Sequence, residues 1–255
     1  MGREILDFRA PGADRRVAYG ASPSQFVDFR VPSGPGPHPI VMMIHGGFWR
    51  DRFDLLHEGP VCAALTASGF VTANVEYRRV GEPGGGWPGT FEDVAAALRC
   101  VRDHAAGLAA DPQRIVVAGH SAGGHLALRL AADDAALQGV VALAPVACLV
   151  EAWELDLGGG AVADFLQASP DTAPDRYDAV CPSRRPAAVP RVLIHGDQDG
   201  IVPLDLSRQY LRLRAGDPAP VRLIELPGAD HFDVIDVRSP AWNVVLGTVR
   251  ALAAL

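Results

Sequence analysis

Short apolar runs alternate along the chain with segments in which apolar residues recur every three or four positions. The apolar runs cover residues 40–45, 71–77, 114–119, 139–145, 191–196 and 221–227. Runs of this kind are typical of strands that are buried on both faces of a parallel sheet. The helical patterns lie near residues 54–68, 91–106, 121–132, 204–214 and 239–254. The alternation predicts an α/β fold, in which helices cover both faces of a mostly parallel, twisted sheet.

Two segments depart from this alternation. Residues 25–32 alternate in polarity and run into a proline-rich turn, which predicts an antiparallel hairpin at the edge of the sheet. Residues 146–189 are too long for a simple connection between strands. We expect them to form a short helical insertion, or cap, over the C-terminal edge of the sheet. Because the pattern contains no repeat and no interdomain linker, residues 1–255 are expected to form a single domain.

Composition narrows the function classes. The chain has 255 residues, a hydrophobic fraction of 49% and a net charge of −7, and all 23 of its Lys and Arg residues are arginines. The arginines are scattered, which argues against a nucleic-acid partner. No apolar run approaches the roughly 20 residues that span a bilayer, and the N-terminus lacks the apolar core of a secretory signal. We therefore expect a cytoplasmic protein without a membrane partner, whose four widely spaced cysteines are buried free thiols.

Residues 119–123, GHSAG, match the pattern G-x-S-x-G at the point where a strand pattern changes to a helix pattern. In a nucleophile elbow, glycines flank the serine because larger side chains would collide with the neighbouring backbone. Ser121 as a plain helix cap would explain the serine but not both glycines. The context therefore predicts that Ser121 is a nucleophile. The N–H group of the next residue, Ala122, is then one donor to the oxyanion of the tetrahedral intermediate.

A nucleophilic serine needs a histidine base and a carboxylate that orients the base. In a strand-turn-helix elbow of this kind, these partners follow the serine in the order acid, then histidine. His231 is the one histidine beyond the loop that follows strand 191–196, and it is the predicted base. Asp199 is the predicted acid, because the turn at 199–203 directs its carboxylate along the sheet edge. Asp197, expected to hydrogen-bond its own loop, and Asp233, close to His231 in sequence, are the rivals.

Several of these segments together carry a family resemblance. HGGFW, GHSAGG, HGDQDGIVP and ADHFD resemble the α/β-hydrolase serine esterases whose oxyanion motif is HGGxW. That group includes kynurenine formamidase (arylformamidase) and related small carboxylesterases. Residues 18–32 and the strand NVEYRRV are also similar to formamidase-like proteins, so the resemblance spans nearly the whole chain. It implies an α/β-hydrolase fold in which the N–H groups of Gly47 and Phe48 complete the oxyanion hole. Phe48 departs from the third glycine of the hormone-sensitive-lipase-like esterases.

The remaining aromatic and histidine residues have structural alternatives. Four aromatic residues are candidates for the substrate pocket, although each is also a plausible core residue: Trp49, Trp87, Trp153 and Phe165. His45 is expected to brace the oxyanion loop, and His195 a later loop. His120 and His125 are expected to have core or surface roles. Because no metal-binding spacing of His, Cys or Glu is present, the sequence predicts neither a metal nor another cofactor.

The hypothesis from sequence is a serine hydrolase that forms an acyl-enzyme on Ser121. Its substrate is expected to be a small-molecule ester, as for a general carboxylesterase, or an aryl formamide such as N-formylkynurenine. An amide hydrolase of the acyl-peptide type and an inactive hydrolase fold that only binds ligands are the alternatives. The sequence leaves a homodimer open.

Overall fold

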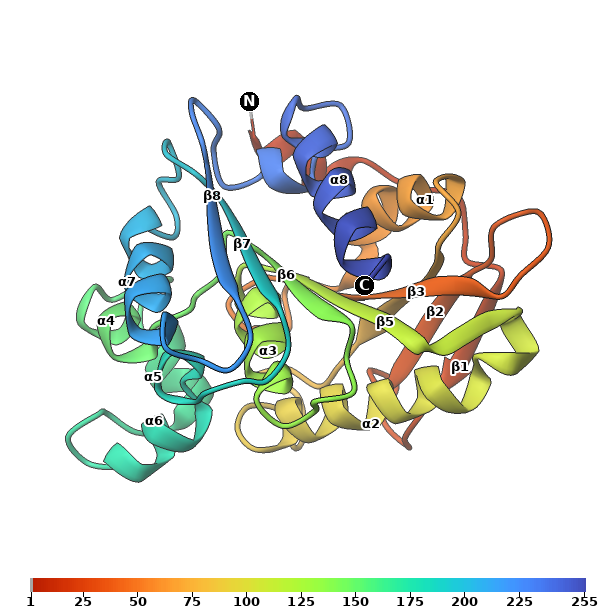
Figure 1. Cartoon of the computed structure of the whole chain (residues 1–255). Coiled ribbons are helices and arrows are strands. Elements are labelled where there is room, and N and C mark those ends of the chain that lie inside the picture. Colours follow the sequence, from red (N-terminus) through yellow and green to blue (C-terminus); the bar gives the residue numbers. More distant parts are fainter. Residues whose placement is uncertain (1) are drawn as a thin grey trace.

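The computed structural model describes residues 2–255, which are built around a sheet of eight strands (Figure 1). In spatial order the strands are β1 (Arg15–Ala18), β2 (Phe26–Arg30), β4 (Val71–Glu76), β3 (His38–Ile44), β5 (Ala110–His120), β6 (Gly139–Leu143), β7 (Arg191–Gly196) and β8 (Val221–Leu226). The pairs β1–β2 and β2–β4 are antiparallel, and every other neighbouring pair is parallel. The mostly parallel sheet predicted from the apolar runs is confirmed.

Helices cover both faces of the sheet, as the alternation predicts. The longer ones are α1 (Gly59–Ala67), α2 (Gly89–His104), α3 (Ala122–Ala131), α7 (Leu204–Arg214) and α8 (Ala241–Ala253). Apolar residues of α1 and α8 pack on one face, and those of α2, α3 and α7 pack on the other. Successive strand residues enter opposite layers, because side chains alternate across a strand. Met42 of β3, for example, faces the second group of helices and Met43 the first.

The antiparallel edge is larger than the sequence suggests. Strand β2 pairs with β1 on one side and with β4 on the other, so the hairpin partner of residues 25–32 precedes them in the chain. The segment RRVA of β1 has only four residues and is largely exposed. It therefore carries no apolar pattern from which a strand could be predicted.

The segment between β6 and β7 is helical, as predicted. It contains α4 (Leu149–Glu154), α5 (Ala161–Leu166) and α6 (Pro174–Val180), followed by the 3-10 turn η4 (Pro182–Arg184). Arg50, in the loop after β3, donates hydrogen bonds to the carbonyl oxygens of Gly158 at 2.7 Å and Gly159 at 2.6 Å. The insertion is thus fastened to the loop at the C-terminal end of β3. No helix within residues 2–255 combines the length and the apolarity that a membrane span requires.

Candidate active site

Ser121 lies at a sharp turn between the end of β5 and the start of α3. Its backbone has φ 56° and ψ −117°, a conformation that side-chain-bearing residues rarely adopt and that costs free energy. A Cβ atom at Gly119 would lie 2.3 Å from the carbonyl oxygen of Gly123, and one at Gly123 would lie 2.0 Å from that of Ile44. Both flanking glycines are therefore required by backbone contact. This is the geometry that the G-x-S-x-G pattern predicts.

The loops after β7 and β8 bring Asp199 and His231 together. The Nδ1 atom of His231 donates a hydrogen bond to Asp199 Oδ2 at 2.6 Å, and both side chains are almost fully buried. The other carboxylate oxygen, Oδ1, accepts hydrogen bonds from the N–H groups of Ile201 and Val202, each at 2.8 Å. These bonds fix the carboxylate and leave Nε2 as the ring nitrogen of His231 that is available to a substrate or nucleophile.

Asp199 is held in its charged form. Burial acts to raise the pKa of Asp199, but hydrogen bonds from His195 and His231 outweigh it and hold this pKa well below its usual range. His195 Nε2 lies 3.1 Å from Asp199 Oδ2, and its Nδ1 lies 2.7 Å from the hydroxyl of Ser207. His195 therefore braces the acid loop, in the structural role that the sequence suggests.

Ser121 and His231 line the same cavity. Within residues 2–255 the Ser121 hydroxyl makes no hydrogen bond to the imidazole, and such bonds often tighten only when substrate is present.

The two alternatives to Asp199 as the acid, Asp197 and Asp233, are hydrogen-bonded to groups other than His231. Asp197 accepts a hydrogen bond from Gly228 N, and Asp233 accepts one from Asp230 N. Both therefore stabilise turns, and neither is bonded to His231.

The loop after β3 faces the serine turn. Gly47 has φ 114° and Phe48 has φ 54°, so this loop turns sharply in the left-handed region. A Cβ atom at Gly46 would lie 2.9 Å from the carbonyl oxygen of His120, which shows how closely the loop approaches the elbow. Among the described residues, no group accepts a hydrogen bond from the N–H of Gly47, Phe48 or Ala122. These three donors are therefore available to an oxyanion.

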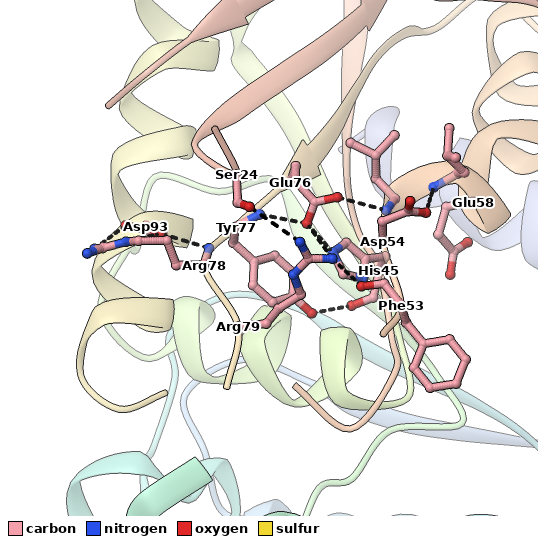
Figure 2. Close-up of polar contacts among 12 residues, drawn as sticks. Ser24, His45, Phe53, Asp54, Glu58, Glu76, Tyr77, Arg78, Arg79 and Asp93 are labelled. Atoms are coloured by element: carbon pink, nitrogen blue, oxygen red, sulfur yellow. Dashed lines mark hydrogen bonds and ion pairs between the residues drawn. The ribbon is translucent and has the colours of Figure 1, made fainter. Parts of the chain in front are cut away.

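A buried polar cluster supports this loop from behind (Figure 2). The Nε2 atom of His45 lies 2.9 Å from Glu76 Oε1 at the end of β4, and its ring stacks on Tyr77 with the centroids 4.3 Å apart. The hydroxyl of Tyr77 donates to the carbonyl oxygen of His45 at 2.8 Å. Glu76 also accepts from Leu55 N at 3.0 Å and pairs with Arg79 at 3.3 Å. His45 thus braces the loop that follows β3.

The charge of Glu76 depends on these partners. Burial acts to raise the pKa of Glu76, but His45 and then Arg79 lower it further than burial raises it. A buried carboxylate without such partners would be costly. Arg79 also hydrogen-bonds the carbonyl oxygen of Phe53, so the cluster ties both ends of the loop 45–55 to the end of β4.

The cavity beside Ser121 has a volume of about 360 Å³. Its apolar walls come from Leu6, Phe48, Phe53, Ile201 and Phe232, and its polar groups include Arg52, His57 and His120. Of these residues, the sequence predicts only Phe48 as a site residue, for the oxyanion hole, and it assigns His120 a core or surface role. Phe53 lies four residues after the HGGFW segment, Ile201 lies two residues after Asp199, and Phe232 directly follows His231. That proximity is the one signal by which the sequence points to them.

The four aromatic residues predicted for the pocket do not line this cavity. Trp49 and Phe165 are fully buried and stack on each other, with ring centroids 4.6 Å apart. Trp87 packs beside Phe91, and Trp153 lies beside a separate hollow over the insertion. The prediction is wrong for this cavity, because the backbone turn at Gly47–Phe48 directs Trp49 into the core and the insertion packs around it.

Comparison with known proteins gives consistent matches. A family model described as BD-FAE matches residues 27–143. Esterase LipC of Mycobacterium tuberculosis is 30% identical over 245 residues, which cover 87% of this chain and 60% of LipC. Esterase LipQ of the same organism is 28% identical, over 88% of this chain and 60% of LipQ. The chain therefore spans about 60% of the length of these two relatives.

Solved structures share the fold. Apo Thermogutta terrifontis esterase 2 has a TM-score of 0.79 at 22% identity, over 97% of this chain and 96% of that structure. A truncated carbohydrate esterase from gut microbiota has a TM-score of 0.82 at 19% identity, over 97% of this chain and 100% of that structure.

Proposed function

We propose that this chain, which belongs to the α/β-hydrolase family together with these esterases, is a serine hydrolase of small carboxylic esters. The observation that carries the proposal is the convergence of three loops on one cavity. Ser121 is held at a strained turn, the His231–Asp199 pair is bonded at 2.6 Å, and unbonded N–H groups face the serine. Acyl transfer needs this set of groups.

The proposed reaction has two halves. The Ser121 oxygen attacks the ester carbonyl while His231 Nε2 takes the hydroxyl proton, and the N–H groups of Gly47, Phe48 and Ala122 bind the oxyanion. Collapse of this intermediate breaks the bond to the alcohol, which leaves with the proton from His231, and the acyl group stays on Ser121. Water then gives up a proton to His231 and attacks the acyl carbon. Collapse of this second intermediate breaks the bond to the Ser121 oxygen, which takes the proton back from His231 as the acid leaves.

The side chains that line the cavity favour a substrate with an aromatic ring and a carboxylate. Phe48, Phe53 and Phe232 offer aromatic surface, and the Arg52 guanidinium has no carboxylate partner among the described side chains. An aryl group that carries a carboxylate fits this combination, because aromatic rings stack and a guanidinium binds carboxylates. The aryl formamide N-formylkynurenine, suggested by the sequence resemblance, has this chemistry and is the second candidate substrate.

A substrate panel separates the two candidates. Initial rates are measured on p-nitrophenyl acetate, butyrate, octanoate and laurate, and on N-formylkynurenine. A cavity of about 360 Å³ predicts the highest kcat/KM on the short esters and a steep loss at the longest chain. If short esters react readily and the formamide not at all, the formamidase assignment is wrong. If no ester reacts and the formamide does, the ester assignment is wrong.

A further inference from the structure

Three side chains that the proposed reaction does not use form a cluster at the cavity wall. His57 and Glu58 belong to the 3-10 turn η2 (Leu55–Glu58), and His120 ends β5. One ligand atom from each lies within 4.8 Å of the other two. Glu58 Oε1 is 3.6 Å from His57 Nε2 and also 3.6 Å from His120 Nδ1. The three side chains are 7%, 0% and 3% exposed, respectively.

The polar atoms at the centre of this cluster have no protein partner. Both carboxylate oxygens of Glu58 and the Nδ1 atom of His120 are buried, and none of the described residues hydrogen-bonds them. Figure 2 shows the Glu58 side chain directed away from the His45–Glu76 cluster, with no contact to it. Burial of unpaired polar atoms costs a large amount of free energy, and a cation bound between them would offset this cost.

The hydrogen bond on the other side of His120 defines what this ligand must be. His120 Nε2 lies 3.0 Å from the carbonyl oxygen of His231, and a carbonyl can only accept, so Nε2 carries the proton. Neutral His120 then presents the lone pair of Nδ1 to Glu58. A nitrogen lone pair and a carboxylate that face each other are both electron donors. A proton or a metal cation between them satisfies both, and a metal ion that binds there displaces the proton. Histidine ligands of metals commonly donate their second N–H to a carbonyl in this way.

We propose that His57, Glu58 and His120 form a binding site for one divalent transition-metal ion, such as Zn²⁺, in the wall of the active-site cavity. Two imidazoles and one carboxylate match the donors that Zn²⁺ accepts, with a fourth position open toward the cavity. Metal–ligand bonds of about 2.1 Å in a tetrahedron place neighbouring ligand atoms about 3.4 Å apart. The two Glu58–histidine separations of 3.6 Å are close to this spacing. Mg²⁺ and Ca²⁺ prefer oxygen ligands and fit the site poorly.

The sequence prediction that no metal is bound missed this cluster for a simple reason. His57 and Glu58 are adjacent, but the third ligand is His120, inside the serine motif and far along the chain. Only the packing of η2 against the end of β5 brings them together.

Occupancy of this site has a consequence for catalysis, which rests on the proposed serine hydrolase. The rings of His120 and His231 are 4.6 Å apart between centroids. During acyl transfer His231 must become positively charged, and the bound ion adds net positive charge beside it. Repulsion between the two charges opposes this step, because both histidines are buried and solvent screens them little. Zn²⁺ is therefore expected to inhibit ester hydrolysis, and a chelator to restore it.

Metal binding is tested first without reference to activity. The full chain is treated with a chelator, dialysed, and titrated with Zn²⁺ in competition with a chromophoric chelator. We expect one Zn²⁺ per chain in the wild type and in Ser121→Ala, and at least tenfold weaker binding in Glu58→Gln and His57→Gln. His38→Gln, a histidine outside the cluster, serves as the matched control. Circular dichroism shows which variants fold, and His57→Gln carries the test if Glu58→Gln does not.

Two results would overturn the site: the wild type binds no stoichiometric Zn²⁺, or both cluster variants bind it as tightly as His38→Gln. Binding by Ser121→Ala keeps this outcome separate from any failure of the proposed hydrolase. In a second step, hydrolysis of p-nitrophenyl acetate is followed with and without Zn²⁺. We expect inhibition of the wild type and none of Glu58→Gln, each relative to its own metal-free rate. Equal rates with and without bound Zn²⁺ in the wild type would refute the inhibitory role.

Discussion

Asp199 is surrounded by donors on every side that the protein offers it. His195 and His231 hydrogen-bond Oδ2, and two main-chain N–H groups hydrogen-bond Oδ1. These contacts keep the carboxylate charged and hold the proton of His231 on Nδ1, which leaves Nε2 free to act as the proposed base. The proposed mechanism needs both the negative charge of Asp199 and its two acceptor oxygens. An asparagine amide has no charge and only one acceptor oxygen.

Asp199→Asn is therefore expected to reduce kcat by about 10⁴-fold with little change in the fold, because the amide favours the wrong histidine tautomer. Steady-state kinetics on p-nitrophenyl acetate and thermal unfolding measure the two effects. Asp197→Asn is the matched control, since its carboxylate serves only a neighbouring turn. A loss below tenfold in Asp199→Asn, or an equal loss in Asp197→Asn, would exclude Asp199 as the acid.

Glu76 is a positioning residue, which acts on the oxyanion loop through His45. Glu76→Gln removes the charge that pairs with His45 and Arg79, and it is expected to cost about 3 kcal/mol of stability. A small displacement of the loop lowers kcat by about 10-fold to 100-fold and changes KM little, because the oxyanion donors act in the transition state.

Glu82→Gln is the control for this prediction. Glu82 also pairs with Arg79 but does not touch His45. It should leave kcat near the wild-type value. Steady-state kinetics and thermal unfolding of both variants measure kcat and stability. Equal kcat values for Glu76→Gln and the wild type would show that the position of the loop does not depend on Glu76.

At the scale of elements, α3 links the serine turn to the core under the insertion. Its first turn carries His125, whose ring meets Trp49 and Phe165 edge to face and whose Nε2 lies 3.2 Å from the carbonyl oxygen of Val180. Burial lowers the pKa of His125 to about 3. Between this value and the ordinary histidine pKa, the unfolded chain binds a proton that the folded chain does not. Stability must therefore fall as the pH falls through this window.

His125→Gln keeps a donor for Val180 and removes the titrating ring. From pH 7 to pH 5 the wild type should lose about 2 kcal/mol more stability than the variant. Urea unfolding at both pH values measures this difference. Phe165→Leu, which disturbs the same packing without a titrating group, should keep the wild-type pH dependence. If the stability of His125→Gln depends on pH as strongly as that of the wild type, His125 is not the source of this pH dependence.

Most strands that the sequence predicts well are buried on both faces. Strand β7 matches its predicted range, and β4 and β6 differ by one or two residues at an end, because a doubly buried strand needs a continuous apolar run. Strand β8 also differs by one residue, although it lies partly exposed at the other edge of the sheet. Strand β1 could not be predicted from the sequence because it lies at the exposed edge of the sheet. Its side chains are mostly exposed, so they need not be apolar. The helix expected at 54–68 begins as a 3-10 turn, which places His57 and Glu58 beside β5.

The same distinction holds for the site. The proximity of Ser121, Asp199 and His231 could be predicted, because each lies in a loop at the end of a strand and the three follow the expected order along the chain. The cavity walls could not, since they depend on the direction of each side chain. Trp49 and Phe53 are both large and lie in the same loop, but Trp49 enters the core while Phe53 faces the cavity. Residue type alone does not separate them.

At the scale of the whole molecule, strand order creates the site. Strands β3, β5, β7 and β8 run parallel, so the loops that carry the proposed oxyanion donors, nucleophile, acid and base all leave the same edge of the sheet. Segments far apart in the sequence meet there: Nε2 of His120, at the end of β5, lies 3.0 Å from the carbonyl oxygen of His231, in the loop after β8. Ligands of open α/β sheets commonly bind at this carboxyl edge.

Covalent capture of the nucleophile tests the central claim most directly. The folded chain is incubated with a fluorophosphonate, and its intact mass and peptide map are measured beside those of Ser121→Ala. Our account predicts one adduct per chain, located on Ser121, and none on the variant, because only an activated serine near the oxyanion donors reacts. An unlabelled wild type, or an adduct that persists in Ser121→Ala, would contradict it.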